Sequence, residues 1–126
     1  MTQVAHIAQW AAFGLLAYVV TAAVLTWLLW LFYLATMCLW RVELAGKQTE
    51  VARRLSAPLL AIGKALGFLV NTFVMTVLLL ELPRELAVSP RLARHIHKLE
   101  ADFRTRIAEW FAWNLLDAYD PRGYHV

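Results

Sequence analysis

The sequence predicts an all-α integral membrane protein, built as a two-transmembrane helical hairpin with a C-terminal amphipathic helix. Of the 126 residues, 61% are hydrophobic and 17% are charged, whereas soluble domains average about 45–50% apolar and about 25% charged residues. All 12 Lys and Arg and all 9 Asp and Glu lie at or after Arg41, so the preceding residues carry no charged side chain. This distribution excludes a disordered chain, a disulfide-rich secreted module and an ordinary soluble globule.

The first predicted span lies within residues 11–40. The uncharged apolar run from Trp10 to Trp40 is longer than the roughly 20 residues that an upright crossing needs. Two arrangements fit this length equally well. In one, the crossing runs from about Ala11 to Tyr33, where aromatic side chains cluster at headgroup level; in the other, a strongly tilted helix continues to Trp40. A signal peptide has an apolar core of only about 7–15 residues, so we expect this helix to be retained.

The second predicted span covers residues 58–81, and a charged connector at 41–57 precedes it. We expect the connector to continue as a helix that is weakened at Gly46. Ser56 and Pro58 are typical of one helix ending and another beginning. Together the two spans and the connector make residues 1–81 a hairpin, with both termini on one side of the membrane.

Within the second span, Lys64 bounds the uncharged stretch that runs to Leu80. Its long side chain is expected to reach the headgroups. Gly63, Gly67 and Asn71 follow one another at steps of four residues. Small residues let helix backbones approach closely, and an amide in hydrocarbon needs a partner, so these three residues predict a helix-packing seam. The pattern leaves open whether the seam lies within the hairpin or between protomers.

Residues 82–126 are predicted to form the amphipathic helix and a short tail. Ser89 and Pro90 are typical of a helix start, as N-cap and first residue. Apolar residues then recur at steps of three and four: Leu92, Ile96, Leu99, Phe103, Ile107 and Trp110. The segment Asp120-Pro121-Arg122-Gly123 predicts a turn after the helix.

This tail is expected to dock on a partner or on the lipid interface through aromatic and apolar side chains. The predicted docking residues are Phe103, Ile107, Trp110, Phe111 and Trp113. So much exposed aromatic surface is unusual on a solvated helix. The polar side of the tail mixes acidic and basic residues, unlike the Lys/Arg-rich face of helices that lie on lipid, and this favours contact with protein.

Motifs for catalysis or cofactor binding are not visible in the sequence. It shows no Gly-rich phosphate loop, no Ser-His-Asp or Cys-His set and no paired carboxylates. His95 and His97 are two residues apart and point to different sides of a helix, whereas metal-binding pairs use a spacing of four. Cys38 is the single cysteine and forms no intrachain disulfide. We therefore expect no catalytic, cofactor-binding or metal-binding residues, no cofactor and no enzymatic activity.

The function expected from these features is that of a small integral membrane scaffolding or accessory subunit, which oligomerises or docks within a larger membrane assembly. Its expected partners are the lipid bilayer and either further copies of itself in a homo-oligomer or other membrane subunits. Nucleic acid is not an expected partner, because the basic and acidic residues of the tail nearly balance. The expected location is the bacterial inner membrane, with both termini in the cytoplasm.

The alternative is a homo-oligomeric membrane pore, holin-like or channel-like. In outline, two crossings followed by a charged tail resemble one class of phage holins, although this tail lacks the dense Lys/Arg cluster with which such proteins often end. A water-filled lumen needs polar residues along one face of a span. The two spans offer few of them: Thr21, Thr26, Thr36, Lys64, Asn71, Thr72 and Thr76.

Overall fold

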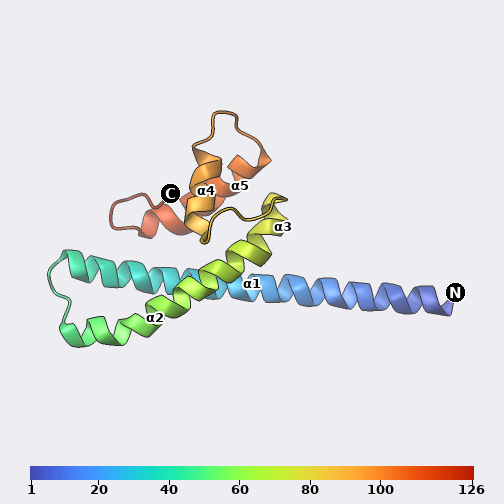
Figure 1. Cartoon of the computed structure of the whole chain (residues 1–126), viewed down its shortest axis with the longest axis horizontal. Helices are drawn as coiled ribbons and strands as arrows, with labels where there is room; N and C mark the ends of the chain where they lie inside the picture. The colour runs from blue at the N-terminus through green and yellow to red at the C-terminus, as the bar shows by residue number, and fades with distance from the viewer.

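The computed structural model describes residues 1–126, and all of its regular structure is helical. The first helix, α1 (Thr2–Leu44), is unbroken, and α2 (Glu50–Leu69) returns antiparallel to it along its second half (Figure 1). By length and composition, both α1 and the helical run Glu50–Leu79 are able to cross a membrane. At 1.5 Å per residue, α1 is about 65 Å long, roughly twice the thickness of a hydrocarbon core.

The reversal between α1 and α2 is shorter than the sequence predicts. Helix α1 ends at Leu44, and Gly46 adopts a positive φ of 66° that glycine tolerates without strain. Thr49 then caps α2, because its hydroxyl accepts a hydrogen bond from the Ala52 N–H at 3.2 Å. The predicted helix start at Pro58 is therefore wrong, and Pro58 lies inside α2.

Beyond α2, a π-helical turn (Val70–Val74) leads into α3 (Met75–Leu79). The buried core lies here, where the π-helical turn and α3 meet the tail. Its fully or nearly buried members are Val70, Val74, Met75, Leu79, Leu92 and Ala108. The α1 side chains packed against this core come from its second half: Ala22, Leu25 and Leu29.

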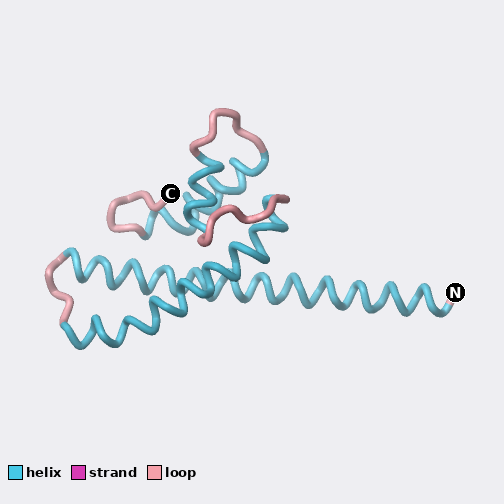
Figure 2. The backbone as a smooth tube through the Cα atoms, viewed as in Figure 1, coloured by secondary structure: helices cyan, strands magenta, loops and turns pink.

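The tail forms two short helices, where the sequence predicts one amphipathic helix. These are α4 (Val88–Ile96) and α5 (Phe103–Phe111), and Figure 2 shows the loop between them. Asp102 starts α5, because its carboxylate accepts hydrogen bonds from the N–H groups of Arg104 and Thr105 in a capping box. The expected stripe is thereby split, and Leu99 faces solvent.

After α5, a second π-helical turn (Ala112–Leu116) and a 3-10 turn (Asp117–Tyr119) lead to the C-terminus. The predicted turn at residues 120–123 is confirmed, since the Gly123 N–H donates to the Asp120 carbonyl at 2.9 Å and Gly123 has a φ of 82°. This turn folds the last three residues back toward α1, where His125 meets the ring of Tyr33.

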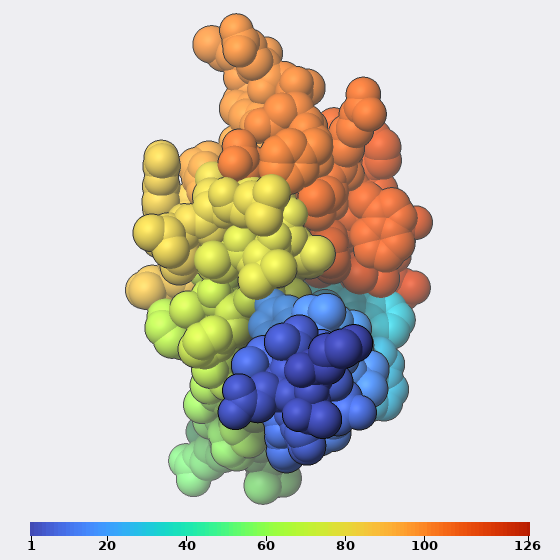
Figure 3. All heavy atoms as spheres, turned by 90° about the vertical axis from the view of Figure 1, so that its right-hand side faces the viewer, coloured from blue at the N-terminus to red at the C-terminus, as the bar shows by residue number.

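Two parts of the molecule differ in their surroundings. We call residues 2–21 of α1 the projecting segment and residues 22–126 the folded body. The projecting segment extends well beyond the other helices (Figure 1). In Figure 3, which looks along α1 from its N-terminal end, the tail gathers to one side of α1.

Candidate functional site

The projecting segment is an exposed apolar helix. All of its residues are exposed, including Trp10 at 71% and Phe13 at 65%, and none carries an Asp, Glu, Lys or Arg side chain. Its one hydrogen bond to the folded body joins the Tyr18 hydroxyl to the Phe73 carbonyl at 2.7 Å. A Cβ atom added to Gly14 would meet nothing within 4 Å. An exposed apolar surface of this extent marks contact with lipid or protein.

Two of the three predicted seam residues lie between α1 and α2. A Cβ atom on Gly63 would lie 3.6 Å from the Phe32 Cβ, and one on Gly67 would lie 3.8 Å from the Leu29 Cδ1. Both are ordinary van der Waals distances, so glycine allows close packing here without being strictly required. The third residue, Asn71, is fully buried but contacts the tail and the segment before it, so it contributes nothing to this contact with α1.

Asn71 belongs to a polar cluster around a fully buried arginine. The Arg91 guanidinium donates to the Asn71 carbonyl at 2.7 Å and to the Glu81 carbonyl at 2.6 Å. In turn, the Asn71 amide donates to the Glu85 carbonyl at 2.5 Å. The Arg91 Nε makes no hydrogen bond and lies 3.5 Å from the Glu81 carboxylate. Because burying a guanidinium is costly unless it is paired, these contacts hold α4 against the end of the second apolar helix.

Ion pairs complete the same cluster. Arg94 contacts both Glu81 and Glu85 at 2.5 Å, and the His95 Nε2 lies 2.8 Å from Glu81. Burial alone would raise the pKa of Glu81, but the hydrogen bonds from Arg94 and His95 outweigh it and lower the pKa to about 2. The hydrogen bond from Arg94 likewise lowers the pKa of Glu85. Both carboxylates are therefore charged at neutral pH and stabilise the fold.

Aromatic residues of α1 hold the far end of the tail. The Trp30 indole N–H donates to the Leu115 carbonyl at 2.9 Å, and the Tyr33 hydroxyl donates to the Leu116 carbonyl at 2.5 Å. The Leu116 carbonyl also accepts from the Asp120 N–H at 3.3 Å, so Tyr33 is its second donor. Farther along, the Arg122 guanidinium lies over the ring of Trp40.

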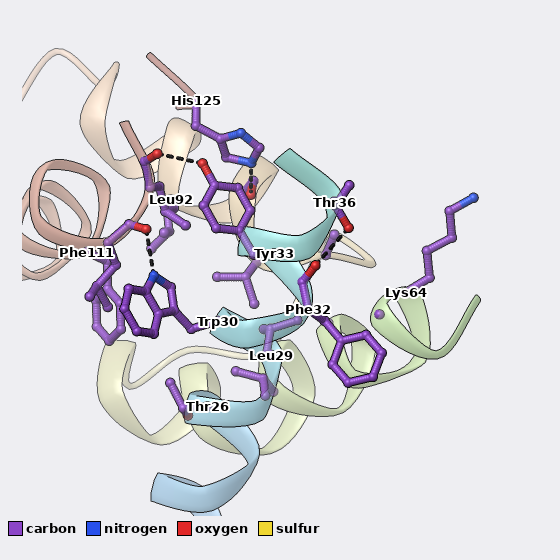
Figure 4. Close-up of a pocket in the computed structure, with 18 of the residues that line it drawn as sticks. Thr26, Leu29, Trp30, Phe32, Tyr33, Thr36, Lys64, Leu92, Phe111 and His125 are labelled. Atoms are coloured by element: carbon purple, nitrogen blue, oxygen red, sulfur yellow. Dashed lines mark hydrogen bonds between the residues drawn. The ribbon is translucent and has the colours of Figure 1, made fainter. Parts of the chain in front are cut away.

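These contacts border an open apolar cavity of about 710 Å³ between α1, α2 and the tail (Figure 4). Most of its lining is hydrophobic, 16 of 23 residues. The hydroxyls of Thr26 and Thr36 donate to carbonyls of their own helix, and the polar groups of Trp30 and Tyr33 are paired with the tail. In Figure 4 the exposed Lys64 side chain points away from the other labelled residues, toward the open side.

Three polar side chains form a hydrogen-bonded series at the wall of this cavity. The Ser89 Oγ lies 2.9 Å from the His125 Nε2, and the His125 Nδ1 lies 2.9 Å from the Asp120 Oδ2. Sequence analysis missed this set because Ser89 was expected to cap a helix. In the structure α4 begins at Val88, two residues before the expected start at Pro90, which frees the Ser89 hydroxyl for His125.

No family model, curated protein or solved structure matches this chain.

The predicted docking residues of the tail divide into two groups. Phe103, Trp110 and Trp113 are exposed at 46%, 55% and 65%. Ile107 and Phe111 instead pack against the core of the folded body. The tail thus docks on its own chain through one face and presents aromatic rings to the outside on another.

Proposed function

We propose that this protein is a membrane-anchored scaffolding or accessory subunit whose projecting segment crosses the bilayer and meets other subunits there. One observation carries this proposal: residues 2–21 form an uncharged helix with every residue exposed. At 1.5 Å per residue this helix is about 30 Å long, which equals the thickness of a bilayer's hydrocarbon core. The exposed rings of Phe103, Trp110 and Trp113 offer a second contact surface outside the membrane.

The position of the charged tail supports a single crossing over the predicted hairpin. The tail lies alongside the second half of α1 (Figures 1 and 3), where it contacts Trp30, Tyr33 and Trp40. If that half of α1 crossed the membrane upright, exposed charges such as Glu100 and Arg106 would enter hydrocarbon. Each would cost about 2.5–3.5 kcal/mol or more. We therefore infer that the folded body stays at one membrane face.

The distribution of Lys and Arg predicts which side of the membrane the folded body occupies. All 12 Lys and Arg lie in the folded body. Positively charged flanks remain in the cytoplasm, so we propose a cytoplasmic folded body and an N-terminus on the opposite face. This proposal retains the expectation that the C-terminal tail is cytoplasmic. It replaces the expectation of a cytoplasmic N-terminus, which it places on the opposite side of the membrane.

The subunit is favoured over the pore because three of the seven polar residues that a lumen would need have partners within the chain. Thr26 and Thr36 donate to carbonyls of α1 itself. Asn71 is buried among the groups around Arg91. Without these side chains the apolar helices offer little to line a water-filled channel.

Disulfide crosslinking in membranes tests the subunit proposal. In a Cys38→Ala background, single cysteines replace Ala8, Ala12, Leu15 or Val19, and Leu99→Cys in an exposed loop of the folded body serves as the control. We expect oxidant-dependent crosslinks that follow one face of the helix, with a doubled mass if the partner is a second copy. A helix that crosslinks at none of the four positions would be surrounded by lipid alone, which contradicts the proposed assembly through this segment.

A further inference from the structure

The series Ser89–His125–Asp120 has the atom order of an acyl-transfer site. The hydroxyl meets Nε2 and the carboxylate meets Nδ1 of the same ring, each at 2.9 Å. In serine hydrolases the same two ring nitrogens have these partners. Since Ser89 and His125 also line the apolar cavity, we propose that Ser89 is a nucleophile and that this site hydrolyses carboxylic esters of apolar acyl chains. This inference is independent of how the chain crosses the membrane.

The ionised carboxylate of Asp120 determines which ring nitrogen of His125 carries the proton. Its side chain is fully buried and accepts hydrogen bonds from the Arg122 backbone N–H at 2.8 Å and from the Arg122 guanidinium at 3.2 Å. Burial acts to raise the pKa of Asp120, but these hydrogen bonds outweigh it and lower the pKa to about 2. An ionised carboxylate only accepts, so the His125 Nδ1 must donate. In the neutral ring Nε2 then accepts the Ser89 hydroxyl proton, which is the direction that general-base catalysis requires.

The nucleophile stands at an uncapped helix terminus. Ser89 is the second residue of α4, and the N-cap, Ala87, has no side chain to bind the first N–H groups. Pro90 carries no N–H, so the available donors in the first turn of α4 are those of Val88 and Ser89. The N-terminal end of a helix favours negative charge, and such charge develops on the carbonyl oxygen when a hydroxyl attacks an ester.

The cavity sets the class of substrate. Its volume of about 710 Å³ lies within the range of about 300–1,000 Å³ that is usual for ligand pockets. Its lining is mostly hydrophobic, and the donors of Trp30 and Tyr33 already bind tail carbonyls. The wall near these rings therefore has few free hydrogen-bond donors for a polar group, so an alkyl or acyl chain fits it better.

The proposed reaction needs only ester and water. The Ser89 Oγ bonds to the ester carbonyl carbon while its proton moves to the His125 Nε2. The bond from this carbon to the alcohol oxygen then breaks, and His125 returns the proton to the departing alkoxide. Water repeats the two steps on the acyl-serine: its proton passes to His125 and then to the Ser89 Oγ. The products are one carboxylic acid and one alcohol, with no change of oxidation state.

The full-length protein in detergent micelles tests this directly, with a fluorophosphonate probe for labelling and p-nitrophenyl octanoate for turnover. The chain has two serines, Ser56 and Ser89, and the Ser56 hydroxyl donates to the Arg53 carbonyl. We expect covalent labelling that Ser89→Ala abolishes and Ser56→Ala preserves. His125→Gln should slow labelling by roughly 100-fold or more, the usual contribution of a general base. Its matched control, His97→Gln at an exposed position, should leave the rate unchanged.

Acyl length and Asp120 provide two further readouts. Octanoate should react at least tenfold faster than acetate, because a longer chain buries more methylenes in the cavity. Asp120 is a positioning residue, so Asp120→Asn should lower kcat by roughly 100-fold or more and leave KM nearly unchanged, since the amide favours the wrong ring tautomer. A folded wild-type protein, verified by circular dichroism, that labels and turns over no faster than Ser89→Ala would overturn the proposal. The series would then only fasten the C-terminus to α4.

Discussion

The two halves of α1 belong to one helix and are both rich in apolar residues, yet they have opposite surroundings. Residues 2–21 are exposed throughout. The half from Ala22 onward packs one side on the core and binds the tail through Trp30 and Tyr33, while Trp27 on another side is 57% exposed. The two halves differ in what the rest of the chain brings to them, because α2 and the tail return only along the second half. An apolar helix shows only that its side chains are more stable out of water. Whether they contact lipid, a partner or their own chain depends on where the other helices pack.

The largest expected effect comes from substituting Arg91, which should destabilise the folded body and leave the projecting segment unaffected. Arg91→Ala removes a fully buried guanidinium and leaves the carbonyls of Asn71 and Glu81 without their donor. Breaking a buried charged group away from its partners costs about 3–5 kcal/mol. We expect trypsin to cut the tail rapidly, while extraction at alkaline pH shows that the protein stays in the membrane. Arg84→Ala, at an exposed position, is the control, and equal protease resistance in the two variants would contradict this role of Arg91.

Low pH should also destabilise the folded body. In the folded protein the pKa of Glu81 and of Asp120 is lowered to about 2, from ordinary values of 4.5 and 3.8. Their stabilisation is therefore complete well above pH 4.5 and is lost as the pH falls toward 2, with about 2 kcal/mol or more lost at pH 3. We expect the Tm of the folded body to drop between pH 6 and pH 3. The projecting segment has no acidic group, so its helicity should not change over this range, and a Tm independent of pH would refute the assigned ion pairs.

Substitutions of two glycines, one packed against the second half of α1 and one in its first half, should change stability by a smaller amount. Gly67 is buried against Leu29, so Gly67→Leu should push α1 and α2 apart and lower stability by about 1–3 kcal/mol. Gly67→Ala should be tolerated, since its Cβ would sit at an ordinary 3.8 Å from Leu29. Gly14→Leu on the projecting segment meets no neighbour in the chain and should leave the Tm unchanged. Thermal unfolding followed by circular dichroism measures all three, and equal Tm values for Gly67→Leu and Gly14→Leu would count against the packing seam.

The smallest expected effect concerns two tryptophans of α1. Trp30→Phe removes the indole donor of the Leu115 carbonyl and should cost about 1 kcal/mol. Trp10→Phe removes an exposed ring that has no contact with the folded body, so the Tm should stay the same. If both variants unfold at the wild-type temperature, the hydrogen bond from Trp30 contributes nothing measurable to docking of the tail.

Local sequence patterns predicted the helical class, the two long apolar helices and the turn at residues 120–123, because composition and turn residues act at short range. They failed where a distant or competing contact decides the structure. Asp102 and Thr105 form a capping box that starts a new helix inside the apolar stripe. Asn71 turns to Glu85 and Arg91, since the buried guanidinium needs acceptors.

The hydrogen-bonded series of the candidate site was even less accessible to sequence analysis. Ser89 and His125 lie 36 residues apart, and they meet only because the turn after Asp120 folds the last residues back. The serine could have been singled out by the absence of a capping side chain at Ala87, had the start of α4 been known. No spacing rule could have supplied its partner.

The central claim is that the projecting segment alone crosses the membrane and that the folded body lies on one face. Accessibility to a membrane-impermeant maleimide tests it most directly, with Cys38→Ala as the background and single cysteines at Thr2, Lys47 and Tyr124. A single crossing predicts that positions 47 and 124 react from the same face and position 2 from the opposite face. If positions 2 and 124 react from one face and position 47 from the other, the chain crosses as a hairpin and the claim is contradicted.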